Sequence, residues 1–526
     1  MRTRFLLFPI LALLTTTIFS LHCRGADDVR VWLTRIDDGT RRETNLALNT
    51  YGPDQDTGYD LLREMPTIRL TATLTDTITG IRIETGETEQ TVLGLGASLT
   101  DASAYLLQEL RQRNRNLYDY TMERLFSLDA GAGFSYIRLP MGSSDYTATD
   151  AYYTYADEPS EDLSTFSIAH DREYIIPIIQ DIKRINPDVQ LMGSPWSPPA
   201  WMKTNNSLLG ISRDDKLAGL TNRLKPEYFE IYAEYFIKYV QAYRSEGILI
   251  NAITLQNEPQ ADGQSYPSLR LTATDEAALI NHVGSRFRQE GITTGIFAHD
   301  HNWTVHPGDV DPSGRDVRVD PLEKVSSLFN NEATDPYLAG SAWHGYSGRM
   351  DDMARVYETL YTTFPDQAIY FTEITAWRLH GTDPEWLNDI RWGLRNNWLG
   401  TFQHKGSVSL EWNLALDQNY GPTLRNDSRG IGLVTIHSDT WNSVKFEREY
   451  YAMAHVSKAA RPGARYLATT LSGGSLDVAA FRLPSGTTSL VVFNENGEDR
   501  AIEIASGGRF FSYVMPARSI ATFIWD

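Results

Sequence analysis

Two glutamates have the residue type and the context for chemistry on a sugar–sugar bond. Glu258 stands between Asn257 and Pro259 after a short strand-like run, and Glu373 follows a second, more apolar run. Most enzymes that hydrolyse glycosidic bonds use two carboxyl groups that flank the scissile bond. The two segments therefore predict a glycosidase, with Asn257 placed to reach a sugar hydroxyl beside that bond.

Two carboxyl groups from distant parts of a chain meet only if the fold brings both to one rim. Between residues 91 and 450, strand-like runs alternate with amphipathic helical runs, such as the helical spacing of apolar residues in 226–247. This alternation predicts a (β/α)8 TIM barrel, in which strand ends carry the catalytic groups. The predicted strands include 135–139, 190–193, 250–255, 295–299, 368–372 and 408–412.

Both ends of the chain have a different pattern from the middle. Residues 26–90 and 451–526 contain short alternating or Thr-rich and Ile-rich runs, which are typical of strands. We expect these two segments to form one β-sandwich attached to the barrel. The predicted fold class is therefore α/β, a (β/α)8 barrel with a β-sandwich built from both chain ends.

The first 25 residues resemble a signal peptide. Arg2 and Arg4 precede an apolar run, 5–19, that is short for a membrane span. We expect export of the protein, and no transmembrane segment. Cys23, the only cysteine, stands where a bacterial lipoprotein carries its lipid, although His22 fits that signal poorly. Cleavage near Ala26 is the alternative.

The composition favours a neutral partner. The net charge is −19 and the pI is about 5.1, and no long run of Lys or Arg occurs, so we expect neither nucleic acid nor an anionic membrane as partner. The 12 Trp and 27 Tyr suit a sugar-binding protein, although aromatic residues also fill cores. We expect a monomer that acts on a β-linked glucan or a β-glucoside.

Several other polar and aromatic residues are candidates for the sugar site. Asp101 follows a Gly-rich run that lacks the third glycine of a nucleotide-binding loop, so we expect it to bind sugar, with a helix cap at Thr100 or Asp101 as the alternative. Trp196 and Trp201 stand on a proline-rich loop and could stack on a sugar. For each of these aromatic residues, packing on the rim of the barrel is the alternative.

Histidines near predicted strand ends raise the question of a metal. His299 and His301 could point the same way, but no third ligand follows at a recognisable spacing, so we expect neither metal nor cofactor. His344 and Tyr346 follow another strand-like run and could reach the pocket. Trp412 ends a further predicted strand and could close the sugar site.

Taken in order, these motifs resemble the family 30 glycoside hydrolases, the family of lysosomal glucosylceramidase. The resemblance runs from about residue 85 to the C-terminal end. Its specificity comes from several motifs that occur together in the same order. They are Gly94-Leu95-Gly96 with Thr100-Asp101, Tyr136–Met141 with Asp145, Ser194-Pro195-Trp196, Asn257-Glu258-Pro259, His344 with Tyr346, Thr372-Glu373, and Trp412–Leu416.

The resemblance implies retaining hydrolysis on a (β/α)8 barrel without a cofactor. It implies that Glu258 is the acid/base and Glu373 the nucleophile, with His344 and Tyr346 supporting the nucleophile. It also implies that other side chains bind the sugar. These are Asp101, Asp145, Trp196, Asn257 and Trp412.

The sequence departs from the family pattern at two places, and both departures concern the leaving group rather than the chemistry. Gly345 stands where glucosylceramidase has an aromatic residue, and the stretch 426–434 looks more like β-1,6-glucanase members. We therefore expect an endo-β-1,6-glucanase. The alternatives are a glucosylceramidase-like or exo-β-glucosidase activity, a β-xylosidase or xylanase, and a surface protein that binds glycans without cleaving them.

Overall fold

The computed structural model describes residues 27–36, 61–71, 79–307, 319–375, 386–425 and 430–526. The predicted signal peptide, Cys23 and residues 426–429 lie outside the described residues.

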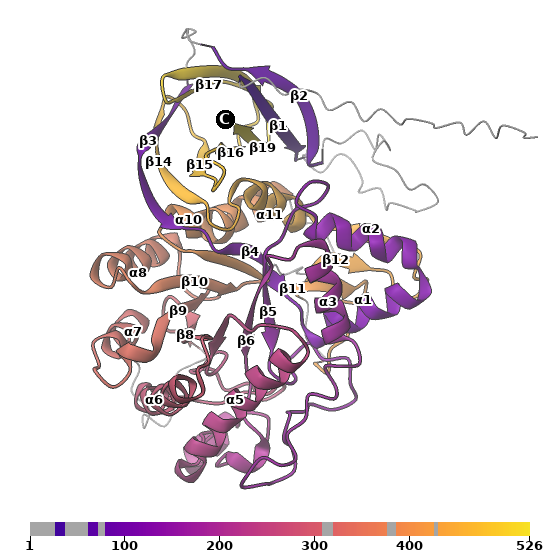
Figure 1. Ribbon diagram of the computed structural model, residues 1–526, viewed down its shortest axis with the longest axis vertical. Coiled ribbons are helices and arrows are strands. Elements are labelled where there is room, and N and C mark those ends of the chain that lie inside the picture. Colours follow the sequence, from indigo (N-terminus) through magenta and orange to yellow (C-terminus); the bar gives the residue numbers. More distant parts are fainter. Residues whose placement is uncertain (1–26, 37–60, 72–78, 308–318, 376–385, 426–429) are drawn as a thin grey trace, which may run out of the picture.

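Eight parallel strands form a closed barrel, as the alternation of runs predicted (Figure 1). Each strand pairs with the next in chain order, and β11 closes the barrel by pairing with both β4 and β10. The strands are β4 (Gly94–Ser98), β5 (Tyr136–Pro140), β6 (Gln190–Ser194), β7 (Ala252–Thr254), β8 (Gly295–Asn302), β9 (Leu338–His344), β10 (Ala368–Glu373) and β11 (Val408–Asp417). Beyond β11 the sheet continues into β12 (Gly432–Ile436) and the antiparallel β13 (Val444–Phe446).

Helices surround the barrel because their apolar faces pack on the outer sides of the strands (Figure 1). The side chain of Thr100 accepts a hydrogen bond from the Ser103 backbone and caps the first of them. The main helices are α1 (Asp101–Arg113), α2 (Arg115–Phe126), α3 (Ile175–Ile185), α5 (Phe229–Ser245), α6 (Ala273–Glu290), α7 (Pro321–Phe329), α8 (Met350–Thr363) and α9 (Trp386–Gly393). Two shorter ones are α4 (Arg213–Ala218) and α10 (Gly400–Gln403).

Apolar side chains fill the inside of the barrel, so it is a packed support rather than a channel. Tyr370 stacks on Phe297 at 4.0 Å between ring centroids and meets Tyr136 edge-on at 5.6 Å. A Cβ on Gly96 would lie 1.9 Å from the carbonyl oxygen of Tyr136, so only glycine allows this approach between strands. The polar site therefore lies above a closed apolar layer.

The two chain ends form one nine-stranded sheet that folds over its own core beside the barrel (Figure 1). Thr71 pairs with Phe510 and links the two edges of the sheet. In spatial order the strands are β18 (Arg509–Met515), β17 (Arg500–Ser506), β3 (Thr79–Thr91), β14 (Arg465–Ser472), β15 (Asp477–Arg482), β16 (Thr488–Asn494), β19 (Ser519–Trp525), β1 (Asp28–Arg35) and β2 (Arg63–Arg69). The prediction of a sandwich built from both ends is confirmed.

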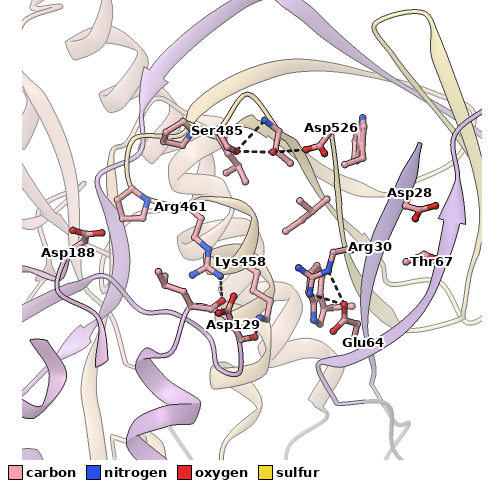
Figure 2. Close-up of a pocket in the computed structure, with 18 of the residues that line it drawn as sticks. Asp28, Arg30, Glu64, Thr67, Asp129, Asp188, Lys458, Arg461, Ser485 and Asp526 are labelled. Atoms are coloured by element: carbon pink, nitrogen blue, oxygen red, sulfur yellow. Dashed lines mark hydrogen bonds and ion pairs between the residues drawn. The ribbon is translucent and has the colours of Figure 1, made fainter. Parts of the chain in front are cut away.

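Helix α11 (Arg448–Ala459) lies between the two units, and all of its residues are buried. The side chain of His455 contacts Thr34 and Thr522 of the sandwich, each at 2.8 Å. The predicted boundary after residue 450 falls within this helix, and the exact division of the chain stays a prediction. A cavity of about 690 Å³ lies between the sandwich and the barrel beside α11 (Figure 2). Among the described residues, no helix has the length and apolar character to cross a membrane.

Candidate active site

The two glutamates reach the same cavity from two different local structures. Glu373 is the last residue of β10, as predicted, whereas Glu258 lies in the loop after β7 ends at Thr254. The backbone N–H of Glu258 donates to the carbonyl of Asp300 at 3.0 Å, and Glu258 has a positive φ of 47°. A non-glycine residue in this conformation stores strain that the surrounding contacts must hold, and such residues are frequent at functional sites.

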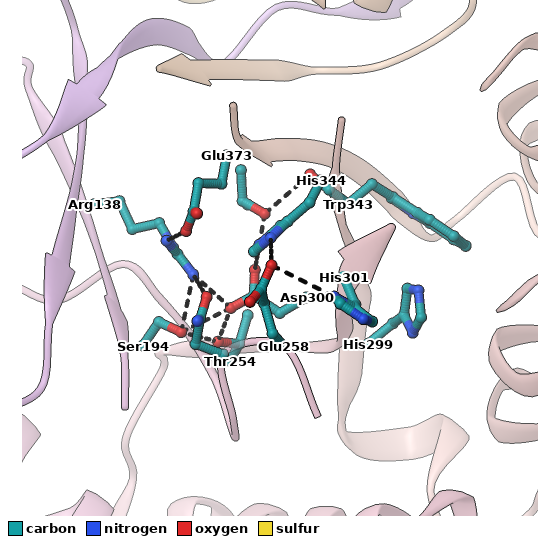
Figure 3. A network of polar contacts seen from close by, with 12 residues as sticks. Arg138, Ser194, Thr254, Glu258, His299, Asp300, His301, Trp343, His344 and Glu373 are labelled. Atoms are coloured by element: carbon teal, nitrogen blue, oxygen red, sulfur yellow. Dashed lines mark hydrogen bonds and ion pairs between the residues drawn. The ribbon is translucent and has the colours of Figure 1, made fainter. Parts of the chain in front are cut away.

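A buried arginine joins the two halves of the site (Figure 3). The guanidinium of Arg138 donates to Glu373 Oε2 at 2.5 Å, to Asn257 Oδ1 at 2.7 Å and to Asp300 Oδ2 at 2.8 Å. Arg138 is fully buried, so these charge-assisted bonds act where water does not screen them. The arginine therefore fixes the position of Glu373 and of the amide beside Glu258.

The second oxygen of Glu373 is also held. The hydroxyl of Tyr346 donates to Glu373 Oε1 at 2.9 Å. Burial raises the pKa of Glu373, and the charges of Glu258 and Asp300 add to that rise, while His344 and Arg138 oppose it. The carboxylate thus has a fixed orientation and little contact with water, as a nucleophile toward a sugar carbon requires.

Glu258 has different neighbours. The Nδ1 atom of His344 lies 3.4 Å from Glu258 Oε1, and that of His301 lies 3.7 Å away, which are distances of ion pairs rather than short hydrogen bonds. Burial raises the pKa of Glu258, but these histidines and Arg138 outweigh it, so the pKa lies below its usual value. Glu258 is therefore the more acidic of the two glutamates.

Asp300 anchors the base of this network. Its carboxylate accepts hydrogen bonds from Arg138, Ser194, Thr254 and Thr372, and it lies 3.1 Å from His344 Nε2. Burial alone would raise its pKa, but the charge of Arg138 and the contact with His344 hold the pKa well below its usual range. Asp300 is a permanent anion, and it keeps both Arg138 and the His344 ring in place.

Glu258, His301 and His344 form the group of potential ligands that could hold a metal ion within the described part of the chain, with their ligand atoms within 4.8 Å of one another. A metal needs neutral imidazoles, because a protonated ring has no lone pair to offer. Burial lowers the pKa of His344, yet Glu373, Asp300 and Glu258 raise it to about 9, which keeps the ring protonated at neutral pH. A metal ion would have to displace this proton to bind here, and the absence of a metal stays a prediction.

Aromatic side chains form one wall of the cavity, whose volume is about 240 Å³. Trp196 stacks on Trp412 with ring centroids 4.9 Å apart, and Arg138 lies 4.9 Å above the Trp196 ring. Both indoles are almost fully buried against each other. The lining residues include Asp145, Tyr146, Trp196, Asn257, Glu258, Tyr266, His301, Tyr346, Glu373, Trp412 and Arg425.

A third carboxyl group faces this cavity. Asp145 lies 3.4 Å from Arg425 Nη1, and the Arg425 guanidinium lies 5.0 Å above the Tyr266 ring. Burial raises the pKa of Asp145 to about 7; Arg425 opposes this rise, whereas the two glutamates add to it. Asp145 therefore changes charge near neutral pH inside the cavity.

Two of the predicted site residues lie elsewhere. Asp101 does not line the cavity, because its carboxylate is occupied by the Ala148 backbone, Tyr153, Tyr174 and His170. His344 is fully buried and does not line the cavity; its ring lies 3.1 Å from Asp300 and 3.4 Å from Glu258.

Two alternatives drawn from the sequence can also be compared with the structure, the helix cap and the packing of Trp201. Thr100 caps α1, while Asp101 does not act as the cap. The Trp201 indole donates to the Ala156 carbonyl at 2.8 Å and does not line the cavity, which fits the packing alternative.

Sequence reasoning did not single out Arg138, Asp300, Tyr266 or Arg425 as site residues. Arg138 and Asp300 each occur in a segment that had been noted, and both stand at polar positions inside buried strands. A charged residue within an otherwise apolar barrel strand was the available signal. Tyr266 and Arg425 lie in loops, where the pattern of the chain gives no such signal.

The comparisons with known proteins agree with this geometry. The chain matches the model of the glycosyl hydrolase family 30 TIM-barrel domain over residues 92–460 and that of the family's β-sandwich domain over 463–523. The chain belongs to glycosyl hydrolase family 30, and it is a glycoside hydrolase.

Named relatives include both glucanases and glucosylceramidases. An endo-1,6-β-D-glucanase of Trichoderma harzianum is 31% identical over 83% of this chain and 84% of its own length. One of Neurospora crassa is 29% identical, with 83% and 85% covered. The lysosomal acid glucosylceramidase of Mus musculus is 27% identical, with 91% and 90% covered. The solved structure of an endo-β1,6-glucanase superposes with a TM-score of 0.77 at 26% identity, covering 95% of this chain and 99% of its own.

Proposed function

We propose that this hydrolase is a retaining endo-β-1,6-glucanase in which Glu373 is the nucleophile and Glu258 the acid/base. The observation that carries the proposal is the pair of glutamates in one cavity with unlike surroundings. Arg138 and Tyr346 hold both oxygens of Glu373, whereas Glu258 faces two histidines. Two carboxyl groups with different environments can take the two different roles that double displacement needs.

In the first step, Glu373 attacks the anomeric carbon while Glu258 gives a proton to the departing oxygen. The bond from the sugar to its neighbour breaks as the bond to Glu373 Oε forms. Arg138 and Tyr346 keep the carboxylate oriented before the attack, so less reorganisation is needed in the transition state. In the second step, Glu258 takes a proton from water, which then releases the sugar from Glu373.

The acid role requires a proton on Glu258, whereas the lowered pKa of Glu258 favours its loss. His344 supplies a reason why one is at hand, since its protonated Nδ1 lies 3.4 Å from Glu258 Oε1 and its Nε2 faces Asp300. With a pKa of about 9, this ring keeps its proton through the neutral range. We infer that the Glu258–His344 pair holds the proton jointly and that it passes through Glu258 to the leaving oxygen.

The choice of β-1,6-glucan rests on the relatives named as endo-1,6-β-D-glucanases in two fungi and on the similar solved structure. A glucosylceramidase activity is the second candidate, because a mammalian glucosylceramidase matches over 91% of this chain. We also propose that the protein is exported and acts as a monomer on its glucan, as its sequence predicts.

A product profile tests the substrate. The purified protein is incubated with β-1,6-glucan, an aryl β-glucoside, glucosylceramide and xylan, and the products are separated over time. We expect β-1,6-glucan to give a series of oligosaccharides early in the reaction, with the Glu373→Gln variant as the inactive control. Glucose alone from the first minutes would indicate exo action, and faster turnover of glucosylceramide would favour the second candidate.

A further inference from the structure

A second cavity, larger than the active site, lies elsewhere in the described part of the protein. It measures about 690 Å³, against about 240 Å³ for the site with the glutamates. Its walls come from both units: β1 contributes Asp28, Arg30 and Trp32, and the end of α11 and the turn after it contribute Lys458 and Arg461 (Figure 2). Residues of β2, of the turn between β15 and β16, of the end of β19 and of the segments before β5 and β6 complete it.

This cavity lies at the end of the barrel opposite to the active site. The segments that precede β5 and β6 line it, whereas the glutamates follow the carboxyl ends of β7 and β10. Alternate residues of β1 face it because side chains of a strand point to opposite sides in turn, and Val29 and Val31 point into the sandwich core instead. A molecule bound here would not touch the catalytic groups.

Charge decides which class of ligand could fit. Lys458, Arg30 and Arg461 are the basic side chains of the lining, and the acidic ones outnumber them: Asp28, Glu64, Asp129, Asp188 and Asp526. Such a lining repels an anion, and its mixture of donors and acceptors suits a neutral ligand with many hydroxyl groups.

Two buried polar groups in the lining lack adequate partners within the described residues. The Oδ1 atom of Asn186 accepts no hydrogen bond there, although Asn186 is only 1% exposed and its Nδ2 donates to the Phe134 carbonyl. The Lys458 ammonium makes one long hydrogen bond, 3.4 Å to the Asp129 carbonyl, and Lys458 is only 3% exposed. Buried polar atoms normally find partners, and a hydroxyl group that approaches the Lys458 ammonium from the cavity would supply one.

Apolar surface accompanies these polar groups. Trp32, Trp525, Leu483 and Pro484 line the same space. Lys458 Nζ lies 5.0 Å from the Trp32 ring, so an ammonium and an indole stand side by side. A sugar presents hydroxyl groups at its edge and C–H groups on its faces, and this combination of donors, acceptors and apolar surface can meet both.

We propose that this cavity is a second, non-catalytic binding site for a segment of neutral glucan. The proposal rests on the proposed function for the class of polysaccharide. A second contact on the same polymer raises the local concentration of cleavable chain without any change at the catalytic groups. The protein would then stay on a long or insoluble glucan between cleavages.

Calorimetry on a catalytically inactive background tests this proposal. A β-1,6-linked gluco-oligosaccharide is titrated into the Glu373→Gln protein, where we expect two binding sites per chain. Adding Ser485→Arg places a bulky side chain in the cavity from an exposed loop position, and we expect one of the two sites to be lost. Ser475→Arg, at an exposed position of the sandwich outside the cavity lining, makes the same change of charge and should keep both sites.

Further variants separate the two sites. Lys458→Met keeps the apolar stem and removes the ammonium, and we expect it to weaken the cavity site about tenfold, as the loss of a buried charged contact does. Trp412→Ala should remove only the site beside the glutamates. A single site that Trp412→Ala removes and Ser485→Arg leaves intact would overturn the proposal, as would no binding, or binding of inorganic phosphate at the cavity instead.

The same titration distinguishes failure of the proposed function from failure of the second binding site. If the oligosaccharide binds only at the cavity, the second site stands while β-1,6-glucan fails as the substrate of the active site. Melting temperatures of the variants confirm that each one is folded.

Discussion

Tyr346 and Arg138 hold opposite oxygens of one carboxylate. The tyrosine hydroxyl donates to Glu373 Oε1 at 2.9 Å, and the guanidinium donates to Glu373 Oε2 at 2.5 Å. Neither oxygen is left to rotate, so the carboxylate keeps one orientation in the cavity. The two donors also favour its charged form against the effect of burial.

Replacing Tyr346 with phenylalanine removes one of these donors and little else. We expect kcat/KM to fall by about ten- to a hundredfold, since a hydrogen bond to a charged group contributes about 1.5–3 kcal/mol. The acidic limb of the pH profile of kcat/KM should move to higher pH, because the loss of a donor raises the pKa of Glu373, which must be ionised to attack.

Tyr232→Phe is the matched control for that variant. Tyr232 is buried in α5, and its hydroxyl makes no hydrogen bond to the described residues. Its removal should change neither kcat/KM nor the pH profile. If Tyr346→Phe behaves like this control, the orientation of Glu373 does not depend on the tyrosine.

Glu258→Gln tests the acid role through the leaving group. Without its proton donor, the protein should lose about a thousandfold in kcat on β-1,6-glucan, whose leaving sugar needs protonation. An acidic phenol leaves an aryl β-glucoside without being protonated. The first step on that substrate should therefore be affected far less. Equal losses on both substrates would show that Glu258 does something other than protonate the leaving oxygen.

Asp145 predicts how stability depends on pH. Its folded pKa is raised to about 7, mainly by burial, so the folded protein keeps this proton where the unfolded chain releases it. The folded state therefore loses stability as the pH rises from the ordinary pKa of aspartate to about 7, and the loss is complete above that. We expect the Asp145→Asn variant to gain in melting temperature relative to the unsubstituted protein as the pH rises from about 5 to about 8.

The comparison between the two proteins at each pH removes effects common to both. A difference in melting temperature that stays constant between the two pH values would mean that Asp145 does not titrate in this range.

Removal of metal ions should leave the activity unchanged. The one cluster of suitable ligands among the described residues contains a protonated His344, and the double displacement itself uses only carboxyl groups. Dialysis against EDTA, followed by assay with and without added Zn²⁺ and Mg²⁺, measures this. Activity that disappears and returns with one of these ions would assign Glu258, His301 and His344 to a metal.

The barrel and the sandwich could be predicted because each has a periodic signal. The alternation of strands and helices located strands such as β5 and β10 to within a residue or two, and it placed Glu373 at a strand end. Glu258 shows the limit of this approach. Its strand ends at Thr254, and the loop that carries it is held by contacts with Pro195 and Asp300 that lie far away in the sequence.

The network under the site could not be predicted for a similar reason. Arg138, Asp300 and His344 lie on three strands, and only the closed barrel shows that they contact one another. Asp101 illustrates the reverse case. Its position after a barrel strand predicted a sugar ligand, whereas tyrosines and a histidine from a distant segment occupy its carboxylate. Tertiary contacts of this kind leave no periodic trace in the chain.

The configuration of the first product tests the central claim most directly. Proton NMR follows the anomeric signals of newly formed reducing ends during hydrolysis of β-1,6-glucan, before mutarotation mixes them. Double displacement through Glu373 predicts that the β-anomer appears first and the α-anomer grows in later. An initial α-anomer would contradict the account, because it would mean that water attacks directly and that Glu373 forms no bond to the sugar.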